Sequence, residues 1–276
     1  MRYEFETVGP IMVTAKLRGS NLTVIVSEDA PVAVVTVEPR RGGDDVAART
    51  RVEMSGNRLQ IEVPKVTGSL FRQGGSVAIE AIVPPGSSLE ADSGSGELRA
   101  QGALLRAEVR NGSGGIDLED VGEARVTSGS GDVVLGDVDT AVVTSGSGDI
   151  RLGRASGRTE IRTGSGDVLA EAGSDITIGT GSGDAVVGST TGRVRLSTGS
   201  GDLTIRTAVE GEIQAKSASG DVTVGVASGT AALLDCSTVS GRVSSELTTD
   251  AGPADGEKGV VLRLRSVSGD VLVRRG

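Results

Sequence analysis

Apolar and polar residues alternate along the C-terminal two-thirds of this chain, in short runs on either side of a recurring Gly-Ser-Gly turn. Successive turns are 17 to 21 residues apart, and a single last step measures 28 residues. The residues seven and five positions before the second turn glycine are usually apolar, as are most of those two and four positions after it. A period of two places alternate side chains on one face, which predicts a half-buried β-strand on each side of the turn. The second turn glycines are Gly96, Gly114, Gly131, Gly148, Gly166, Gly183, Gly201, Gly220, Gly241 and Gly269.

Each repeat is predicted to be one coil, made of a strand, a tight turn, a second strand and a looser return. So short a strand buries its apolar face only against a neighbour, and stacked coils at a strand spacing of about 4.8 Å share hydrogen bonds and one thin core. The sequence therefore predicts an all-β fold, a parallel β-solenoid (β-helix) of about nine or ten short coils. A right-handed coil is favoured, and no helical period recurs along the chain.

The domain organisation follows from where the repeat begins and where it is interrupted. Residues 1–86 contain alternating apolar runs and turn signals without the Gly-Ser-Gly repeat, and are expected to form a β-rich N-terminal cap. The solenoid repeats then occupy residues 87–276. The 28-residue step predicts a polar loop excursion at about 246–259. After it, strands at 260–265 and 271–274 are expected to form the last coil, with no recognisable cap.

Composition narrows the possible functions. The chain of 276 residues has 43 Gly, one Cys, one Tyr, two Phe and neither His nor Trp, so the core must be aliphatic and histidine-dependent chemistry is excluded. A net charge of -9, without a basic run, disfavours nucleic acid as a partner. The sequence shows no long apolar run of the kind found in signal peptides or membrane helices. We therefore expect a cytoplasmic protein without membrane insertion.

An acidic residue follows the second turn glycine in most repeats. In a stack these carboxylates form a ladder, whose like charges require a cation, turn N–H groups or solvent to offset them. Two interpretations remain open: a cation-binding ladder, or aspartates that each cap their own turn through an Asx-type hydrogen bond. Local turn chemistry favours the second. The candidate metal ligands are Asp132, Asp149, Asp167, Asp184, Asp202 and Asp221, and the pattern continues at Asp270.

Other candidate chemistry is weaker. The Gly-Ser-Gly turns do not lead into a helix with a following lysine, as a phosphate-binding loop would. Cys236 occupies a repeat position that is aliphatic in other coils, which predicts a core thiol. Carboxylates such as Glu160 and Asp117 form no specific glycosidase pattern. We expect no catalytic residue, no cofactor and no enzyme activity.

One outward-facing repeat position is unusually apolar in some coils. Three positions after the second turn glycine stand Val134, Leu169 and Val186. Such a stripe on a solenoid face is a possible partner surface, although isolated surface valines and leucines are also ordinary. Both interpretations remain open.

The order of several segments resembles a known family. These are FETVGPIMVTAKLRGSNLTVIVSEDAPVAVVTVEPR near the N-terminus, then ARTRVEMSGNRLQIEVPK, SVAIEAIVPPGSSLE and the recurring TGSGDV. They resemble the bacterial β-strand-repeat proteins called toastrack or putative adhesin, a domain family of unknown function. The resemblance implies a β-solenoid fold and, in some relatives, association with envelope-stress systems that sense membrane damage or antimicrobial peptides. It carries no catalytic motif.

These observations favour a non-enzymatic scaffold that binds a protein partner or a second copy of itself. The first alternative is an adhesin or envelope-stress component, which the resemblance implies. The second is a cation-binding solenoid that uses the aspartate ladder.

Overall fold

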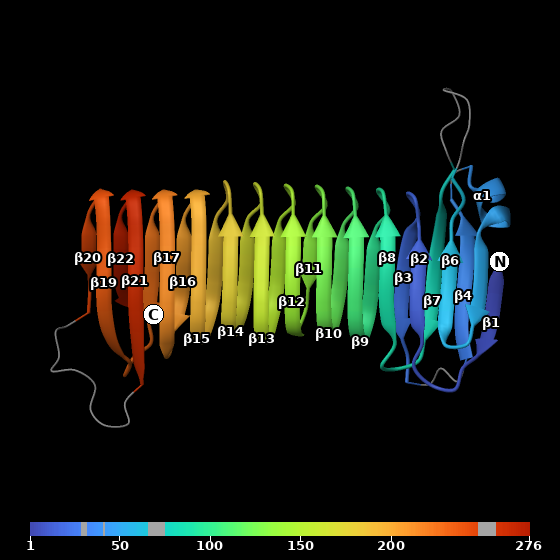
Figure 1. Cartoon of the computed structure of the whole chain (residues 1–276), viewed down its shortest axis with the longest axis horizontal. Coiled ribbons are helices and arrows are strands. Elements are labelled where there is room, and N and C mark those ends of the chain that lie inside the picture. Colours follow the sequence, from blue (N-terminus) through green and yellow to red (C-terminus); the bar gives the residue numbers. More distant parts are fainter. Residues whose placement is uncertain (29–31, 41, 66–74, 248–257) are drawn as a thin grey trace. The chain divides into compact units, whose positions relative to one another are not determined.

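The computed structural model describes residues 1–28, 32–40, 42–65, 75–247 and 258–276. The chain divides into two compact units, unit 1 (Met1–Gly136) and unit 2 (Asp137–Gly276), and each is described by itself. Within the described ranges both units consist almost entirely of β-strands, with one short helix (Figure 1). The predicted all-β class is confirmed, and the domain boundary at residue 86 stays a prediction.

Unit 1 begins with short strands and continues into long ones. Its elements are β1 (Arg2–Glu6), β2 (Met12–Lys16), β3 (Asn21–Val26), β4 (Val32–Pro39), α1 (Asp44–Arg49), β5 (Arg51–Ser55), β6 (Arg58–Glu62), β7 (Val77–Val83), β8 (Ser88–Ser93), β9 (Leu98–Asn111), β10 (Ile116–Ser128) and β11 (Val133–Leu135). The long strands contribute to both sides of the stack: residues 98–101 of β9 pair with β3, and residues 106–111 pair with β8.

The first coil of the chain, β2 and β3, has paired strands on both of its sides within unit 1. Strand β2 pairs in parallel with both β6 and β8, and β3 pairs in parallel with both β7 and β9. Antiparallel strands follow on the other side of this coil, because β4 pairs with β7, β1 with β4 and β5 with β6. Among the described strands of this unit, β1 and β5 are therefore the outermost at the N-terminal end.

Unit 2 repeats one pattern from its start. Its elements are β12 (Val138–Ser145), β13 (Ile150–Thr163), β14 (Val168–Thr180), β15 (Ala185–Ser200), β16 (Leu203–Ala208), β17 (Gly211–Ser219), β18 (Val222–Val226), β19 (Ala231–Ser240), β20 (Val243–Ser245), β21 (Gly259–Ser268) and β22 (Val271–Arg275). Parallel strands stack in register with the repeat: Ile178 lies opposite Ile161 on one side and Leu196 on the other. This register is the one that the 17- to 18-residue spacing predicts, and it is consistent with a solenoid.

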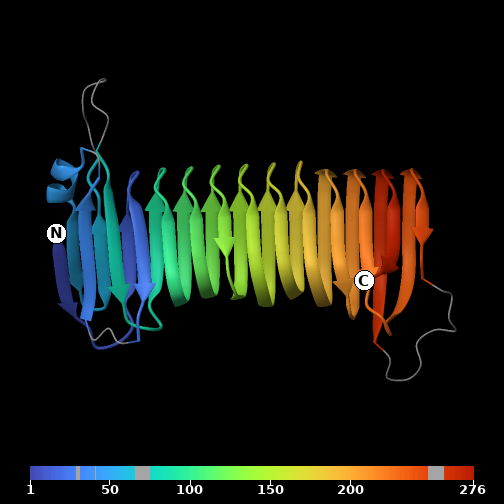
Figure 2. The same ribbon diagram turned by 180° about the vertical axis from the view of Figure 1, so that it is seen from behind.

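The last coils of unit 2 are not stacked in sequence order. Strand β21 pairs with β17 on one side and β19 on the other, and β22 pairs likewise with β18 and β20 (Figure 1). The red C-terminal strands consequently lie between orange ones, which is also visible from behind (Figure 2). The strands predicted at 260–265 and 271–274 are present as β21 and β22, but β19 and β20, and not these strands, lie at the end of the stack. Of the predicted excursion at 246–259, residues 248–257 lie outside the described residues.

The apolar content of the two coils explains this order. The coil at the C-terminus directs Leu262 and Leu264 into the core, where both are 0% exposed. The equivalent positions of β19 carry Leu234 and Cys236. An end coil leaves one side of its inward row uncovered, so more apolar surface is buried when the two-leucine coil is internal.

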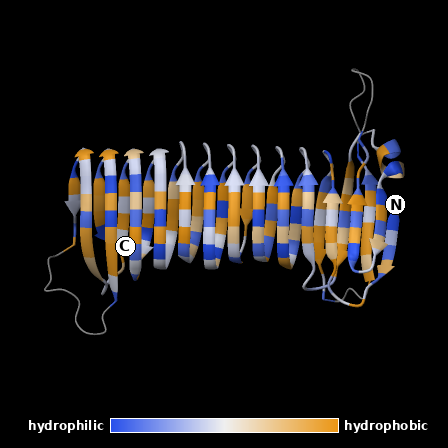
Figure 3. Ribbon diagram, viewed as in Figure 1, coloured by the Kyte–Doolittle hydropathy of each residue, from blue (hydrophilic) through white to orange (hydrophobic). Residues whose placement is uncertain are grey.

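The interior of each unit is aliphatic, as the composition requires. Orange apolar bands alternate with blue and white bands along the strands (Figure 3). Inward residues such as Leu118 in unit 1 and Val187 in unit 2 are 0% exposed. Inward hydroxyls at the turn are also satisfied: the Thr163 Oγ1 accepts a hydrogen bond from the Gly166 N–H at 3.1 Å. The corresponding hydroxyls of Thr180 and Thr198 instead donate to the Gly166 and Gly183 carbonyls of the preceding coil, at 3.4 and 3.3 Å.

Candidate functional site

The turn aspartates of unit 2 connect neighbouring coils. The Oδ1 atom of each aspartate accepts a hydrogen bond from the backbone N–H at the same position of the next coil. The successive N to Oδ1 distances are Asp167 to Asp149 3.0 Å, Asp184 to Asp167 2.9 Å, Asp202 to Asp184 2.8 Å, Asp221 to Asp202 2.8 Å, Asp270 to Asp221 2.7 Å and Arg242 to Asp270 2.8 Å. The expectation that each aspartate caps its own turn is therefore wrong. The reason is that stacking places the backbone N–H of the next coil within hydrogen-bonding distance of the carboxylate.

These hydrogen bonds offset the like charges of the ladder. The exposed side chains of Asp184 and Asp202 also remain in contact with water. In unit 1, Asp132 is also exposed, and its carbonyl accepts the N–H of Ile116 at 2.9 Å. No group of three or more His, Cys, Asp or Glu that could hold a metal ion occurs among the described residues. Cation binding by the ladder stays a prediction.

The structure places only some residues of the predicted apolar stripe next to one another. In unit 2, Leu169 lies opposite Val186 on the adjacent strand, and both are half-buried. Arg151 precedes them in the same row and Thr204 follows. In unit 1, Val134 lies opposite Asp117 and is 36% exposed. The structure thus provides one apolar pair within unit 2 and a separate valine in unit 1.

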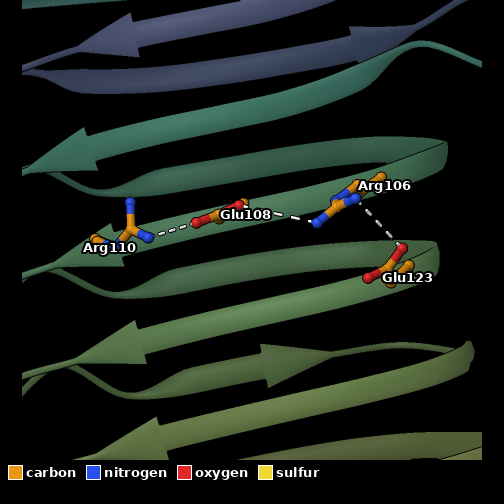
Figure 4. Close-up of polar contacts among 4 residues, drawn as sticks. All are labelled: Arg106, Glu108, Arg110 and Glu123. Atoms are coloured by element: carbon orange, nitrogen blue, oxygen red, sulfur yellow. Dashed lines mark hydrogen bonds and ion pairs between the residues drawn. The ribbon is translucent and has the colours of Figure 1, made fainter.

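Several charged side chains on the outer sheets form ion pairs with one another. In unit 1, Glu108 lies 2.5 Å from Arg110 and 4.0 Å from Arg106, which also reaches Glu123 at 3.6 Å (Figure 4). These contacts make Glu108 an ion-pair acceptor on the sheet surface.

Unit 2 repeats this arrangement around Glu160. Its carboxylate lies 2.5 Å from Arg162 and 3.9 Å from Arg158. Both neighbours of the carboxylate are cationic, which gives it the role of an ion-pair acceptor on the sheet surface.

The thiol of Cys236 is less buried than predicted. Its side chain points inward from β19 but is half-buried, because β19 belongs to the terminal coil. Burial raises the pKa of the Cys236 thiol, and the nearby Asp235 charge raises it further, against a smaller lowering by a hydrogen bond to the Leu264 backbone. The neutral thiol is therefore favoured, which opposes a nucleophilic role.

The terminal coil contains features that the sequence reasoning missed. Leu234 and Val243 occupy inward positions yet are 38% and 46% exposed. The available signal was Arg242, which stands where the turn of the internal coil has Asp270; both turns have valine in place of the first glycine, as Val239 and Val267. This departure from the repeat marks the coil at which the stack of unit 2 ends.

A hollow of about 430 Å³ lies in unit 1, beside the helix. Its lining residues are Ala48, Arg49, Thr50, Arg51, Glu62 and Pro64. Arg49 forms an ion pair with Asp45 at 3.1 Å.

Within the described ranges, no helix reaches the length and apolar character of a membrane span.

Comparison with known proteins places the chain in a family. Its structure resembles that of a "putative adhesin" from Bacteroides fragilis, with 14% identity, a TM-score of 0.43 and coverage of 99% of this chain and 96% of that one. It also resembles a "putative lipid binding protein" from Parabacteroides distasonis, with 15% identity, a TM-score of 0.44 and coverage of 97% and 96%. No curated protein matches the sequence. The Toastrack DUF4097 family model matches residues 13–176 and 172–274, and the chain therefore belongs to the Toastrack DUF4097 family.

Proposed function

We propose that this protein is a non-enzymatic scaffold that binds a protein partner, or another copy of itself, through the outer surface of its stacked sheets. The observation that carries the proposal is the apolar pair Leu169 and Val186, which lies on adjacent, hydrogen-bonded strands of unit 2. Backbone hydrogen bonding fixes the spacing of this pair before any partner arrives. A preordered apolar surface loses little conformational entropy on binding.

The surroundings of the pair support recognition of a protein surface. Arg151 on one side and Thr204 on the other provide a polar rim to the apolar centre. This arrangement resembles the polar rim and apolar centre of protein interfaces. In unit 1, Val134 is a separate candidate contact for a partner.

A pull-down of the tagged chain from cell extract tests the proposal. The double variant Leu169→Glu with Val186→Glu should lose the partner, because two buried charges would replace an apolar contact. The matched control is Thr177→Glu with Ser197→Glu, which adds the same charge to the other outer sheet of unit 2. The same capture by both double variants, or no specific partner at all, would contradict the proposal.

The expected cytoplasmic location is part of this proposal. Fractionation of cells that express the native protein tests it, and recovery in the envelope fraction, with or without stress, would support an adhesin or envelope-stress role instead. The right-handed coil and the total of nine or ten coils also belong to the proposal, and an experimental structure would test both.

The cation-binding alternative has its own test. Calcium titration of the intact chain by calorimetry should give heat and raise the melting temperature if the ladder binds the ion. The variant Asp184→Asn with Asp202→Asn should then lose both effects. Absence of heat in the unsubstituted protein would remove this alternative.

A further inference from the structure

The stack of unit 2 ends in an uncovered coil, formed by β19 and β20 and called here the open coil. Its inward residues Leu234 and Val243 are 38% and 46% exposed, whereas their equivalents in the preceding coil, Leu262 and Val271, are both 0% exposed. Among the described residues, none pairs with the free edge of β19 or β20. The core of the unit therefore reaches solvent at this end.

Strands β19 and β20 carry few of the charges that protect exposed edges, and the charged residues beside β20 are Arg242 and Glu246, one at each end. The outermost strands of unit 1 alternate with charge, as Arg2 and Glu4 do on β1 and Arg51 and Glu53 do on β5. Strand β20, in contrast, reads Val-Ser-Ser, and β19 carries a single charge, Asp235, which pairs with Arg265 at 3.3 Å. Charged edge strands discourage pairing with other chains, and an uncharged edge permits it.

The turn of the open coil disfavours the addition of another parallel coil. Each interior aspartate of unit 2 offers a carboxylate to the N–H of the next coil, and the last such bond joins Asp270 to the N–H of Arg242 at 2.8 Å. A further parallel coil would bring its turn N–H against Arg242, whose guanidinium is only a donor. The parallel ladder therefore cannot continue in the same form.

The sequence of this edge suits antiparallel pairing with itself. Residues 242–246 read Arg-Val-Ser-Ser-Glu, and all five side chains are exposed. Antiparallel pairing centred on Ser244 places Arg242 of each copy opposite Glu246 of the other, so that the two opposite-charge pairs form together. The same pairing places Val243 opposite Ser245 on the inward side. Cross-strand pairs of this kind stabilise an antiparallel register, and like charges in their place destabilise it.

We propose that the open coil is an interface with a second copy of this chain, in which the two β20 edges pair antiparallel about Ser244 and form a closed, symmetric dimer. A second copy offers the cross-section of aliphatic core that this end leaves uncovered, and the two-fold arrangement uses the same surface on both chains. This inference goes beyond the proposed function, because it places a second copy of the chain at the coil end and not on the outer sheet surface. The outer pair Leu169 and Val186 is left free for a different partner.

Charge exchange at the edge tests the proposal. The mass of the full-length chain would be measured by analytical ultracentrifugation over a range of concentrations, for the unsubstituted protein, Arg242→Glu, Glu246→Arg and the double variant. Each single variant places like charges opposite each other twice, and the dimer dissociation constant should rise about tenfold or more. The double variant restores both pairs and should recover the dimer. Arg206→Glu, an exposed charge reversal on the interior coil strand β16, is the matched control and should leave dimerisation unchanged.

A second measurement reports on the same end without any substitution. Cys236 is the single cysteine of the chain and lies on the open coil, so its alkylation should slow as protein concentration rises through the dimer dissociation constant. A rate independent of concentration would overturn the proposal.

Other outcomes are equally informative. A strict monomer, or a dimer whose affinity ignores both single variants, would overturn the proposal. The protein could also be a monomer in which Cys236 becomes reactive only after residues 248–257 are deleted. That result would mean that the chain's own segment covers the open coil, and it would overturn the proposal. A dimer lost in the Leu169→Glu and Val186→Glu variant but kept in Arg242→Glu would overturn this inference while supporting the proposed function.

Discussion

The second glycine of each turn is required by its neighbour in the stack. A Cβ atom built at Gly183 would overlap the carbonyl oxygen of Gly166 in the preceding coil, and one at Gly201 would overlap that of Gly183. Backbone atoms have no other rotamer to adopt, so the stack itself would have to shift. The recurring glycine is therefore needed because neighbouring coils approach each other closely at the turn.

Replacement of one such glycine should be costly. Gly183→Ala is expected to destabilise the protein by about 2 kcal/mol or more, because the added methyl group has to displace a neighbouring backbone. Gly179→Ala is the control in the same coil, since its Cβ would meet only the Ser197 hydroxyl at an ordinary 3.5 Å. Urea unfolding followed by circular dichroism measures both. Equal stability of the two variants would contradict the close approach at the turn.

The thiol of Cys236 should titrate at an unusually high pH. Burial, and then the Asp235 charge, raise its pKa, so the thiolate forms only at higher pH and alkylation at neutral pH should be slower than in the unfolded chain. The rate of iodoacetamide reaction against pH gives the midpoint in dilute protein. Asp235→Asn should lower that midpoint, and a midpoint at or below that of the urea-unfolded chain would refute the expected direction.

At the scale of strands and turns, the aspartate ladder joins coils that are neighbours only in space. The carboxylate of Asp184 accepts the Asp202 N–H, and Asp167 accepts that of Asp184. A hydrogen bond to an ionised acceptor is stronger than a neutral one, but solvent exposure reduces its net contribution. Each rung is therefore a modest, directional connection that favours correct register.

Two substitutions of one turn aspartate distinguish the contribution of its hydrogen bond to stability from that of its charge. Asp184→Ala is expected to destabilise the protein by about 1 kcal/mol, because the Asp202 N–H loses its acceptor. Asp184→Asn keeps an oxygen at the same place and should retain most of the stability. Thermal unfolding compares the two variants at one pH. A larger loss in the asparagine variant than in the alanine variant would show that charge, not the acceptor, matters.

The strands were predictable from the sequence, and the neighbours of the end coils were not. Alternation around Gly166 and Gly183 predicts both strands and their register, because every interior repeat obeys the same pattern. The periodicity cannot say which coil lies next to β19, since Leu234 and Leu262 occupy the same repeat position. In the same way, the sequence of one turn predicts an Asx-type hydrogen bond within that turn. The N–H that Asp184 contacts belongs to the next coil, which the sequence of the turn does not show. The prediction for the candidate site was wrong where the contacts of a residue come from another repeat.

Coil order can be measured with two leucines. Leu262→Ala should cost about 2 to 4 kcal/mol because its side chain is fully buried, whereas Leu234→Ala, at 38% exposure, should cost clearly less. Both residues stand at the same repeat position, so each serves as the control for the other. Stacking in sequence order would reverse the ranking of their unfolding free energies.

At the scale of the whole molecule, the core is assembled from many similar layers and has no single centre. Each interior coil of unit 2 contacts the coil before it and the coil after it, as β14 does with β13 and β15. Stability in such a protein is close to a sum of layer and neighbour terms. With two Phe, one Tyr and no Trp, no bulky aromatic residue anchors the whole chain.

This layered construction should tolerate the loss of one complete coil. Deletion of residues 167–183 joins Gly166 to Asp184 and recreates the turn sequence, so the remaining strands keep their faces. We expect a cooperatively folded chain of reduced stability by circular dichroism and thermal unfolding. Deletion of 167–175 alone removes fewer residues but breaks the repeat, and should be more damaging. The reverse ranking would show that the coils are not interchangeable layers.

The internal position of β21 and β22 sets a constraint on how the protein is made. Residues 259–276 are synthesised after β19 and β20, yet the strands that they form pair with β17 and β18 on one side and with β19 and β20 on the other. The coil of β19 and β20 is therefore synthesised before the layer on which it rests exists. We expect this end of unit 2 to reach its native pairing only after residues 259–276 have left the ribosome, and a chain that stops before them to lack a stable end.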